Sequence, residues 1–179
     1  MTRSIALTGM MGSGKTTVAD LVAARIGREV IDTDLEVEAE TGRSISDIFE
    51  EDGESRFREL ERDSVVEACT RRDVVIALGG GAVLDEGNVE ALHESAWIVL
   101  LEAPVEVLGD RVADARGRPL LQTGAELAPI WEQREERYRS TADATVDATA
   151  PPPEVAMAVL AAAVAAGDVL SDTERAALR

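Results

Sequence analysis

Residues 9–16 read GMMGSGKT, which matches the phosphate-binding pattern G-x-x-x-x-G-K-[S/T] and directly follows the apolar run at residues 5–7. This order predicts a strand, a glycine-rich loop and then a helix over about residues 15–26. Glycines let backbone N–H groups turn toward an anionic phosphate, the lysine supplies a positive charge, and the threonine hydroxyl is a ligand for Mg²⁺. The stretch therefore predicts a nucleotide-binding site in an α/β protein.

The lysine of this stretch is unusual in the composition of the chain. The chain has 18 Lys and Arg residues, and Lys15 is the only lysine among them. A chain that uses arginine everywhere else but lysine here indicates a position that needs a compact ammonium rather than a planar guanidinium. We predict that Lys15 is nucleotide-binding and also catalytic. The predicted nucleotide-binding residues of the loop and the following helix are Gly12, Ser13, Gly14, Lys15, Thr16 and Thr17.

Length and charge limit the remaining possibilities. A chain of 179 residues is expected to form a single domain, and its net charge of −17 disfavours binding to nucleic acid or to an anionic membrane. Cys69 is the single cysteine, so no internal disulfide can form, and we expect a cytoplasmic protein without a signal segment or membrane span. We also expect a monomer.

Apolar runs alternate with helical patterns along the chain. Continuous apolar runs of this kind are typical of a parallel sheet that is covered on both faces, so we predict a three-layer α/β fold with a five-stranded parallel sheet flanked by helices. The strands are expected at about residues 5–7, 29–32, 74–78, 97–101 and 144–147. The helices are expected at about residues 15–26, 35–41, 45–52, 54–71, 85–94, 104–112, 126–140 and 154–166.

Two segments fall outside this alternation. Residues 113–119 break the periodicity and are predicted to be exposed and mobile, within a lid over about residues 112–124. The polar segment over residues 167–179 is either a frayed tail or a short added helix.

Two aspartates end the second predicted strand. Asp32 and Asp34 are two residues apart, and an extended backbone would direct both side chains to the same side, toward the phosphate loop. One carboxylate would then serve Mg²⁺ and the other an acceptor hydroxyl. The alternative is that they are acidic caps at the start of a helix.

Several motifs occur together in a specific order, and in this respect the chain resembles the shikimate kinases, within the nucleoside-monophosphate-kinase branch of P-loop folds. The resemblance extends to about residue 166 and rests on GMMGSGKT at 9–16, DTD at 32–34, FRELE at 57–61, GGGAV at 79–83 and RPLL at 118–121. It implies a mobile lid and transfer of the γ-phosphate of ATP to the 3-hydroxyl of shikimate, with Mg²⁺ as cofactor.

The resemblance also implies residue roles. Thr16 and Asp32 would hold Mg²⁺, Asp34 would orient or deprotonate the acceptor hydroxyl, and Arg118 would close over the phosphates as a catalytic and ATP-binding residue. The substrate-binding set would be Asp34, Arg58, Gly79, Gly80, Gly81 and Arg134, the two arginines holding the carboxylate.

Some of these assignments have local alternatives. Arg116 competes with Arg118 for the lid role, and Arg137 and Arg139 stand near Arg134. Glu61 lies three residues after Arg58 and is expected to hold its guanidinium in place. Residues 147–151 contain no arginine where many family members have one near adenine, which leaves the base contact open; Arg111 is a candidate.

Three other functions remain as alternatives at this level. A kinase for another small acid, such as gluconate kinase, would share the loop and the fold. A nucleoside-monophosphate kinase would phosphorylate AMP or CMP. A regulatory protein would bind ATP without transferring its phosphate, which the presence of Asp34 and Arg118 disfavours.

Overall fold

The computed structural model describes residues 2–114 and 124–178. Its sheet consists of β1 (Ser4–Thr8), β2 (Glu29–Asp32), β3 (Val74–Ala77), β4 (Ala96–Glu102) and β5 (Ala144–Asp147). Its helices are α1 (Lys15–Ile26), α2 (Thr33–Thr41), α3 (Ile45–Glu51), α4 (Gly53–Thr70), the 3-10 helix η1 (Ala82–Leu84), α5 (Glu86–Ser95), α6 (Val105–Asp114), α7 (Gly124–Thr141), α8 (Pro152–Ala166) and α9 (Asp172–Ala177).

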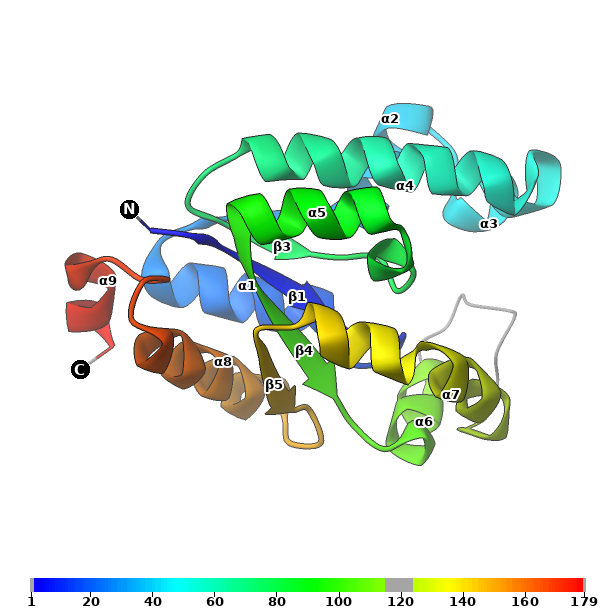
Figure 1. The fold of residues 1–179 in the computed structure, drawn as a ribbon. Helices are drawn as coiled ribbons and strands as arrows, with labels where there is room; N and C mark the ends of the chain where they lie inside the picture. Colours follow the sequence, from blue (N-terminus) through cyan, green and yellow to red (C-terminus); the bar gives the residue numbers. More distant parts are fainter. Residues whose placement is uncertain (1, 115–123, 179) are drawn as a thin grey trace.

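The five strands form one sheet in the order β2-β3-β1-β4-β5, and all pairs are parallel. Helices α1 and α8 pack together on one face, whereas α4 and α5 pack on the other (Figure 1). Every residue of β1 and β3 is buried, as expected for strands that are covered on both faces. The predicted three-layer fold with a five-stranded parallel sheet is therefore confirmed.

The buried apolar residues form two clusters, a large one around the sheet and a smaller one. The smaller cluster joins α2, α3 and α4 through Val37, Ile48, Phe57 and Leu60. It packs beside the carboxyl end of β2, so these three helices form a compact unit next to the phosphate loop (Figure 1). Both tryptophans, Trp97 and Trp131, pack in or against the main core.

Several predicted helix boundaries were wrong by two residues; α2, for example, begins at Thr33 rather than at residue 35. Helix α7 begins at Gly124 rather than at about residue 126, and it contains Pro129. Pro129 is the sixth residue of α7, so it removes one intrahelical hydrogen bond from the second turn. Helix α8 begins at Pro152 rather than at residue 154, since proline suits the first turn of a helix.

The C-terminal segment contains a short helix, which decides between the two alternatives for residues 167–179. Helix α9 begins with a capping box in which Ser171 and Glu174 exchange hydrogen bonds. Glu174 also accepts from the buried guanidinium of Arg28 at 2.6 Å. The described part of the tail is thus fixed to the junction between α1 and β2.

No helix in the two described ranges is both long enough and apolar enough to cross a membrane. The lid predicted over about residues 112–124 lies mostly outside the described residues, and so do Arg116 and Arg118.

Candidate active site

The phosphate loop connects β1 to α1 and places three glycines in backbone conformations that other residues rarely adopt. Gly9, Gly12 and Gly14 have φ angles of 145°, 81° and 84°. A Cβ on Gly12 would lie 2.7 Å from the carbonyl oxygen of Leu108, so this position also requires glycine because α6 packs directly against the loop.

The loop leaves the start of α1 available to an anion. Gly14 is the N-cap residue and provides no side-chain hydrogen bond, so the first N–H groups of α1 are not capped by a side chain. The buried hydroxyl of Ser13 has no hydrogen-bond partner in the described structure. Lys15 Nζ donates to the carbonyl oxygens of Gly9 at 2.8 Å and Met10 at 3.1 Å, which holds the ammonium over the loop. These features fit the phosphates of a nucleotide.

Thr16 and Asp32 form the candidate metal site. Thr16 lies in the first turn of α1, and its hydroxyl donates to Asp32 Oδ2 at 2.6 Å. Hydroxyl and carboxylate oxygens are the ligands that Mg²⁺ prefers, and Mg²⁺ in phosphate-transfer sites uses only one or two protein carboxylates. The donor set therefore fits Mg²⁺. Thr17 lies beside them and is exposed.

The sequence argument that placed Asp32 and Asp34 on one extended strand was wrong. Asp32 ends β2 and is the N-cap of α2, with Oδ1 accepting from the backbone N–H groups of Asp34 at 3.1 Å and Leu35 at 3.2 Å. Asp34 therefore lies in the first helical turn. Helix capping and a role in the metal site are compatible for Asp32, because one carboxylate oxygen caps α2 and the other contacts Thr16.

Asp34 and Glu61 both point at Gly79. This glycine follows Leu78, the residue directly after β3. A Cβ on Gly79 would lie 2.5 Å from Asp34 Oδ1 and 2.6 Å from Glu61 Oε1. Glycine is thus the residue that leaves room for the two carboxylates. This arrangement joins α2, α4 and the loop after β3 at one point of the molecule.

Arg58 lies beside this pair and is held by two carboxylates. It donates to Glu61 at 2.7 Å and to Glu54 at 3.0 Å, and its guanidinium packs against Gly81, where a Cβ would collide with it. Burial opposes the charge of Arg58, but the hydrogen bonds and charges of Glu61 and Glu54 outweigh this effect and raise its pKa. The prediction that Glu61 holds the Arg58 guanidinium is confirmed.

Glu61 is a buried carboxylate with one unsatisfied oxygen. Its side chain is 3% exposed, and Oε1 has no hydrogen-bond partner among the described residues. Burial raises the pKa of Glu61, and the charge of Asp34 adds to this effect, whereas Arg58 and Arg134 oppose it. A ligand with a hydroxyl group could satisfy Oε1, which is a buried acceptor in a site that also contains guanidinium groups.

The structure separates the three arginines of α7. Arg134 is half-buried, and its charge acts on both Glu61 and Tyr138, which places it in the site. Arg137 donates to the carbonyl oxygen of Val83 at 2.8 Å, and Arg139 pairs with Glu102 at 2.6 Å. Of the three, Arg134 is the one whose charge opposes the raised pKa of Glu61.

Two residues that the sequence argument did not select position the glycine segment. Thr33 accepts a hydrogen bond from the N–H of Gly79 at 2.9 Å, and the Tyr138 hydroxyl donates to the carbonyl oxygen of Gly80. The only sequence signal for Tyr138 is that it is the single tyrosine and lies four residues after Arg134.

Arg111 reaches the loop between β5 and α8. Its guanidinium donates to the carbonyl oxygens of Ala148 at 2.8 Å and Thr149 at 3.0 Å. The loop is also ordered internally, because Asp147 accepts from the N–H of Thr149 at 2.8 Å. Arg111 therefore lies against the segment that the sequence associated with the base.

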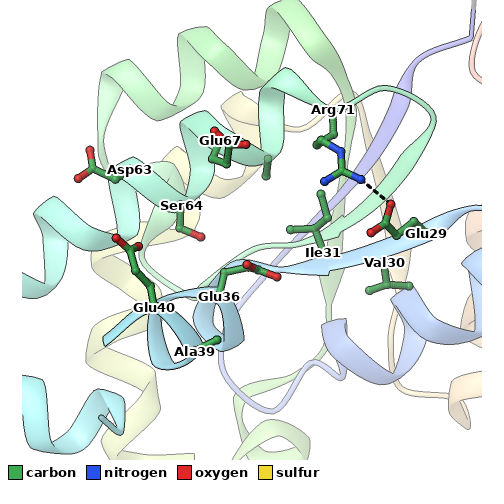
Figure 2. A pocket seen from close by; sticks show the side chains of 11 residues that line it. Glu29, Val30, Ile31, Glu36, Ala39, Glu40, Asp63, Ser64, Glu67 and Arg71 are labelled. Carbon is green, nitrogen blue, oxygen red and sulfur yellow. Dashed lines mark hydrogen bonds and ion pairs between the residues drawn. The ribbon is translucent and has the colours of Figure 1, made fainter. Parts of the chain in front are cut away.

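A separate pocket of about 610 Å³ lies between β2, α2 and α4, away from the phosphate loop (Figure 2). Its ionisable lining residues are Glu29, Glu36, Glu40, Asp63, Glu67 and Arg71. Arg71 is paired with Glu29 at 2.7 Å, so the remaining carboxylates give this pocket a negative charge that disfavours anionic ligands (Figure 2). It is not a suitable site for ATP or for a small acid.

Comparisons with known proteins agree with this geometry. The family model described as shikimate kinase matches residues 11–164. A shikimate kinase from Thiobacillus denitrificans is 44% identical over 144 residues, which cover 79% of this chain and 79% of that protein. A solved structure of shikimate kinase from Acinetobacter baumannii in complex with shikimate has a TM-score of 0.88 and 34% identity, covering 93% of this chain and 96% of that one.

The fold alone is shared more widely. A gluconokinase from Sinorhizobium meliloti covers 89% of this chain and 92% of its own, with a TM-score of 0.54 and 18% identity. That likeness concerns the fold only.

Proposed function

Because this chain belongs to the shikimate kinase family, it is an ATP-dependent kinase that phosphorylates the 3-hydroxyl of shikimate, and we propose which of its residues perform each part of the reaction. The products are shikimate 3-phosphate and ADP. The observation that supports the division of roles is the junction of β2 and α2, where the N-cap residue Asp32 contacts Thr16 and Asp34 in the first helical turn lies at Gly79. The proposed phosphate side and the proposed acceptor side of the reaction are therefore joined through the start of this helix.

Asp34 orients the acceptor hydroxyl and accepts its proton. Its Oδ1 would lie 2.5 Å from a Cβ on Gly79, and Asp34 is two residues from Asp32 of the candidate metal site. The neighbouring carboxylate, Glu61, is hydrogen-bonded to Arg58. A carboxylate within hydrogen-bond reach of the hydroxyl provides the base that phosphoryl transfer requires.

Arg58 and Arg134 bind the substrate carboxylate. Planar guanidinium groups match a carboxylate with two parallel hydrogen bonds, and two of them overcome the negative charge of the protein locally. The backbone of Gly79, Gly80 and Gly81 can approach the ligand closely because these residues lack a Cβ.

Lys15, Thr16 and Asp32 act on the phosphate side. The ammonium of Lys15 neutralises charge on the transferred group, and the α1 N-terminus with Gly12, Ser13 and Gly14 holds the phosphates. Thr16 and Asp32 would hold Mg²⁺, which would supply further charge neutralisation when bound. Arg118, outside the described residues, is proposed as the lid arginine that excludes water.

We also propose that the chain functions as a single kinase domain, as a monomer and in the cytoplasm. The family match over most of the chain supports one domain. Analytical ultracentrifugation at sedimentation equilibrium tests this directly, since the molar mass that it measures would be twice as large for a dimer.

The experiment that tests the reaction and the base together is the release of ADP from MgATP with and without shikimate. We expect shikimate-dependent release in the wild type and its near loss in Asp34→Asn, which keeps the size of the side chain but removes the base. Asp63→Asn, an exposed aspartate of the separate acidic pocket, is the matched control and should retain activity. Full activity of Asp34→Asn would contradict its role, and phosphorylation of gluconate or AMP in preference to shikimate would contradict the substrate.

A further inference from the structure

The segment after β3 consists of three glycines, so its own side chains cannot fix its position. Glycine has the largest backbone freedom of any residue, and a functional loop built from it must be held by neighbours. Thr33 of α2 binds the N–H of Gly79 at 2.9 Å, and Asn88 of α5 binds the carbonyl oxygen of Ala82 at 3.0 Å. These contacts hold the two ends of the segment.

The middle of the segment is held from α7. The hydroxyl of Tyr138 donates to the carbonyl oxygen of Gly80. A trans peptide is planar, and its C=O and the following N–H point in opposite directions. Fixing the Gly80 carbonyl therefore also fixes the direction of the N–H of Gly81.

Tyr138 is itself held rigidly. Its relative exposure is 0%, and its ring stacks on that of Trp131 with centroids 5.9 Å apart and an angle of 17° between the rings. Burial raises the pKa of the Tyr138 hydroxyl, although the nearby Arg134 opposes this, so the hydroxyl keeps its proton at neutral pH and acts as a donor.

Arg134 precedes Tyr138 by four residues, which is one turn of α7. The same helical turn thus contains the arginine assigned to the substrate carboxylate and the hydroxyl that binds the glycine segment. A shift of α7 relative to the loop would change the distance between Arg134 and the loop N–H groups.

We infer that Tyr138 is a positioning residue for substrate recognition: by binding the Gly80 carbonyl, it sets the glycine segment and Arg134 at the separation that a shikimate carboxylate and ring require. This inference rests on the proposed function of Arg134 and of the glycine segment. Tyr138 does not take part in phosphoryl transfer, so its effect belongs to shikimate binding and not to ATP binding or turnover.

The first test is Tyr138→Phe in the full-length protein, which keeps the ring and its stacking on Trp131. Loss of one buried hydrogen bond at this position should raise the KM for shikimate about 5- to 15-fold, while the KM for ATP and kcat stay within about twofold. ADP affinity measured on the same sample confirms that the variant is folded.

The matched control is Ser4→Ala, which also removes a buried hydroxyl that bonds to backbone, the N–H of Val74 at 3.4 Å, at the opposite end of the strands. It should change the melting temperature but neither KM. An unchanged shikimate KM in Tyr138→Phe, or equal changes of both KM values in the two variants, would overturn the inference.

A second measurement does not depend on the folding of a variant. Because the chain has one tyrosine, growth with 3-fluorotyrosine labels Tyr138 alone. Its ¹⁹F resonance should shift when shikimate is added and shift much less with ADP. A ¹⁹F chemical shift that does not change when shikimate is added would overturn the inference.

Arg134→Gln separates this inference from the function on which it rests. If Arg134→Gln raises the shikimate KM and Tyr138→Phe does not, the role of Tyr138 is wrong while that of Arg134 stands. If neither variant affects it, the assignment of Arg134 fails, and the role inferred for Tyr138 fails with it.

Discussion

Lys15 and Arg58 both bring a positive charge to the site, but their neighbours differ. Lys15 donates to the loop carbonyl oxygens of Gly9 and Met10, so its charge is directed at the phosphate side. Arg58 is bound by Glu61 and Glu54 on α4 and faces Gly81. The difference predicts different kinetic defects for the two residues.

We expect Lys15→Ala to lower kcat by about 10²- to 10³-fold or more, because it removes charge stabilisation of the transferred group. Arg58→Lys should chiefly raise the KM for shikimate, by about 10- to 100-fold, because an ammonium cannot replace a two-pronged hydrogen bond to a carboxylate. Steady-state kinetics with each substrate varied in turn measure both effects.

Arg56→Lys is the control for Arg58→Lys. Arg56 lies on the same helix, is half-exposed and, within residues 2–114 and 124–178, pairs only with Glu59, so its substitution should leave both KM values unchanged. Equal losses of shikimate affinity in Lys15→Ala and Arg58→Lys would contradict the division of roles.

Gly79→Ala tests how closely the two carboxylates pack. The added methyl group would overlap Asp34 Oδ1 and Glu61 Oε1, and displacing a catalytic group by a fraction of an ångström to one ångström should lower kcat/KM about 100-fold. Gly87→Ala in α5 is the control, since its Cβ would meet only Asp85 Oδ1 at 3.2 Å. Near-normal kcat/KM in Gly79→Ala would mean that Asp34 is not placed as described.

At the scale of elements, α2 and α9 are each fixed by one acidic residue that performs two tasks. Asp32 caps α2 and contacts Thr16, which couples the start of this helix to the phosphate loop. Glu174 closes the capping box of α9 and binds Arg28, whose side chain is 2% exposed and also donates to the carbonyl oxygens of Arg3 and Val169. The last helix is therefore part of the folded structure.

Glu174→Gln should lower the free energy of unfolding by about 1.5–3 kcal/mol at pH 7, because it leaves a buried guanidinium without its countercharge. Burial opposes the charge of Glu174, but hydrogen bonds from Arg28 and Ser171 outweigh it and lower the pKa of the carboxyl. A lowered pKa in the folded state means that this stabilisation is present at neutral pH and is lost as the pH falls through the folded-state pKa.

Urea unfolding at pH 7 and in the acidic range measures this difference, which should shrink as the pH falls. Glu50→Gln, an exposed glutamate of α3, is the control and should change stability by less than about 0.5 kcal/mol. A difference between wild type and Glu174→Gln that stays constant with pH would contradict the ionic contribution of Glu174.

At the scale of the whole molecule, the net charge of −17 sets the long-range field. Like charges repel one another in the compact state, and added salt screens this repulsion. The substrates are also anionic, so the arginines and Lys15 must create a local positive region. The separate acidic pocket retains the charge of the rest of the surface (Figure 2).

The melting temperature should therefore rise by about 2–4 °C between 0.02 M and 0.3 M NaCl, equivalent to about 1 kcal/mol for a chain of this size. Differential scanning calorimetry measures it. Choline chloride at equal ionic strength should act equally, since screening does not depend on the cation. A melting temperature that falls with salt would mean that the surface ion pairs outweigh the net repulsion.

The sequence predicted the fold because the fold rests on local patterns. Apolar runs of strand length, the capping box at Ser44 and the glycine pattern at residues 9–16 each depend on near neighbours in the chain. The order of the motifs identified the family. Helix starts were less well predicted, because Asp32 and Pro129 fit more than one local conformation.

Tertiary structure decided what local patterns cannot encode. Glu61 and Asp34 meet at Gly79, Tyr138 meets Gly80 across 58 residues of chain, and Arg28 meets Glu174 across 146. Arg137 and Arg139 are bound by Val83 and Glu102, which favours Arg134 as the arginine of α7 that we propose for the substrate carboxylate. Sequence periodicity reports which face of an element is apolar, whereas these contacts depend on how the parallel sheet brings separate helices together at its carboxyl edge. The sequence thus determined the fold class and the chemistry of the site, and the packing of α2, α4 and α7 determined which residues share it.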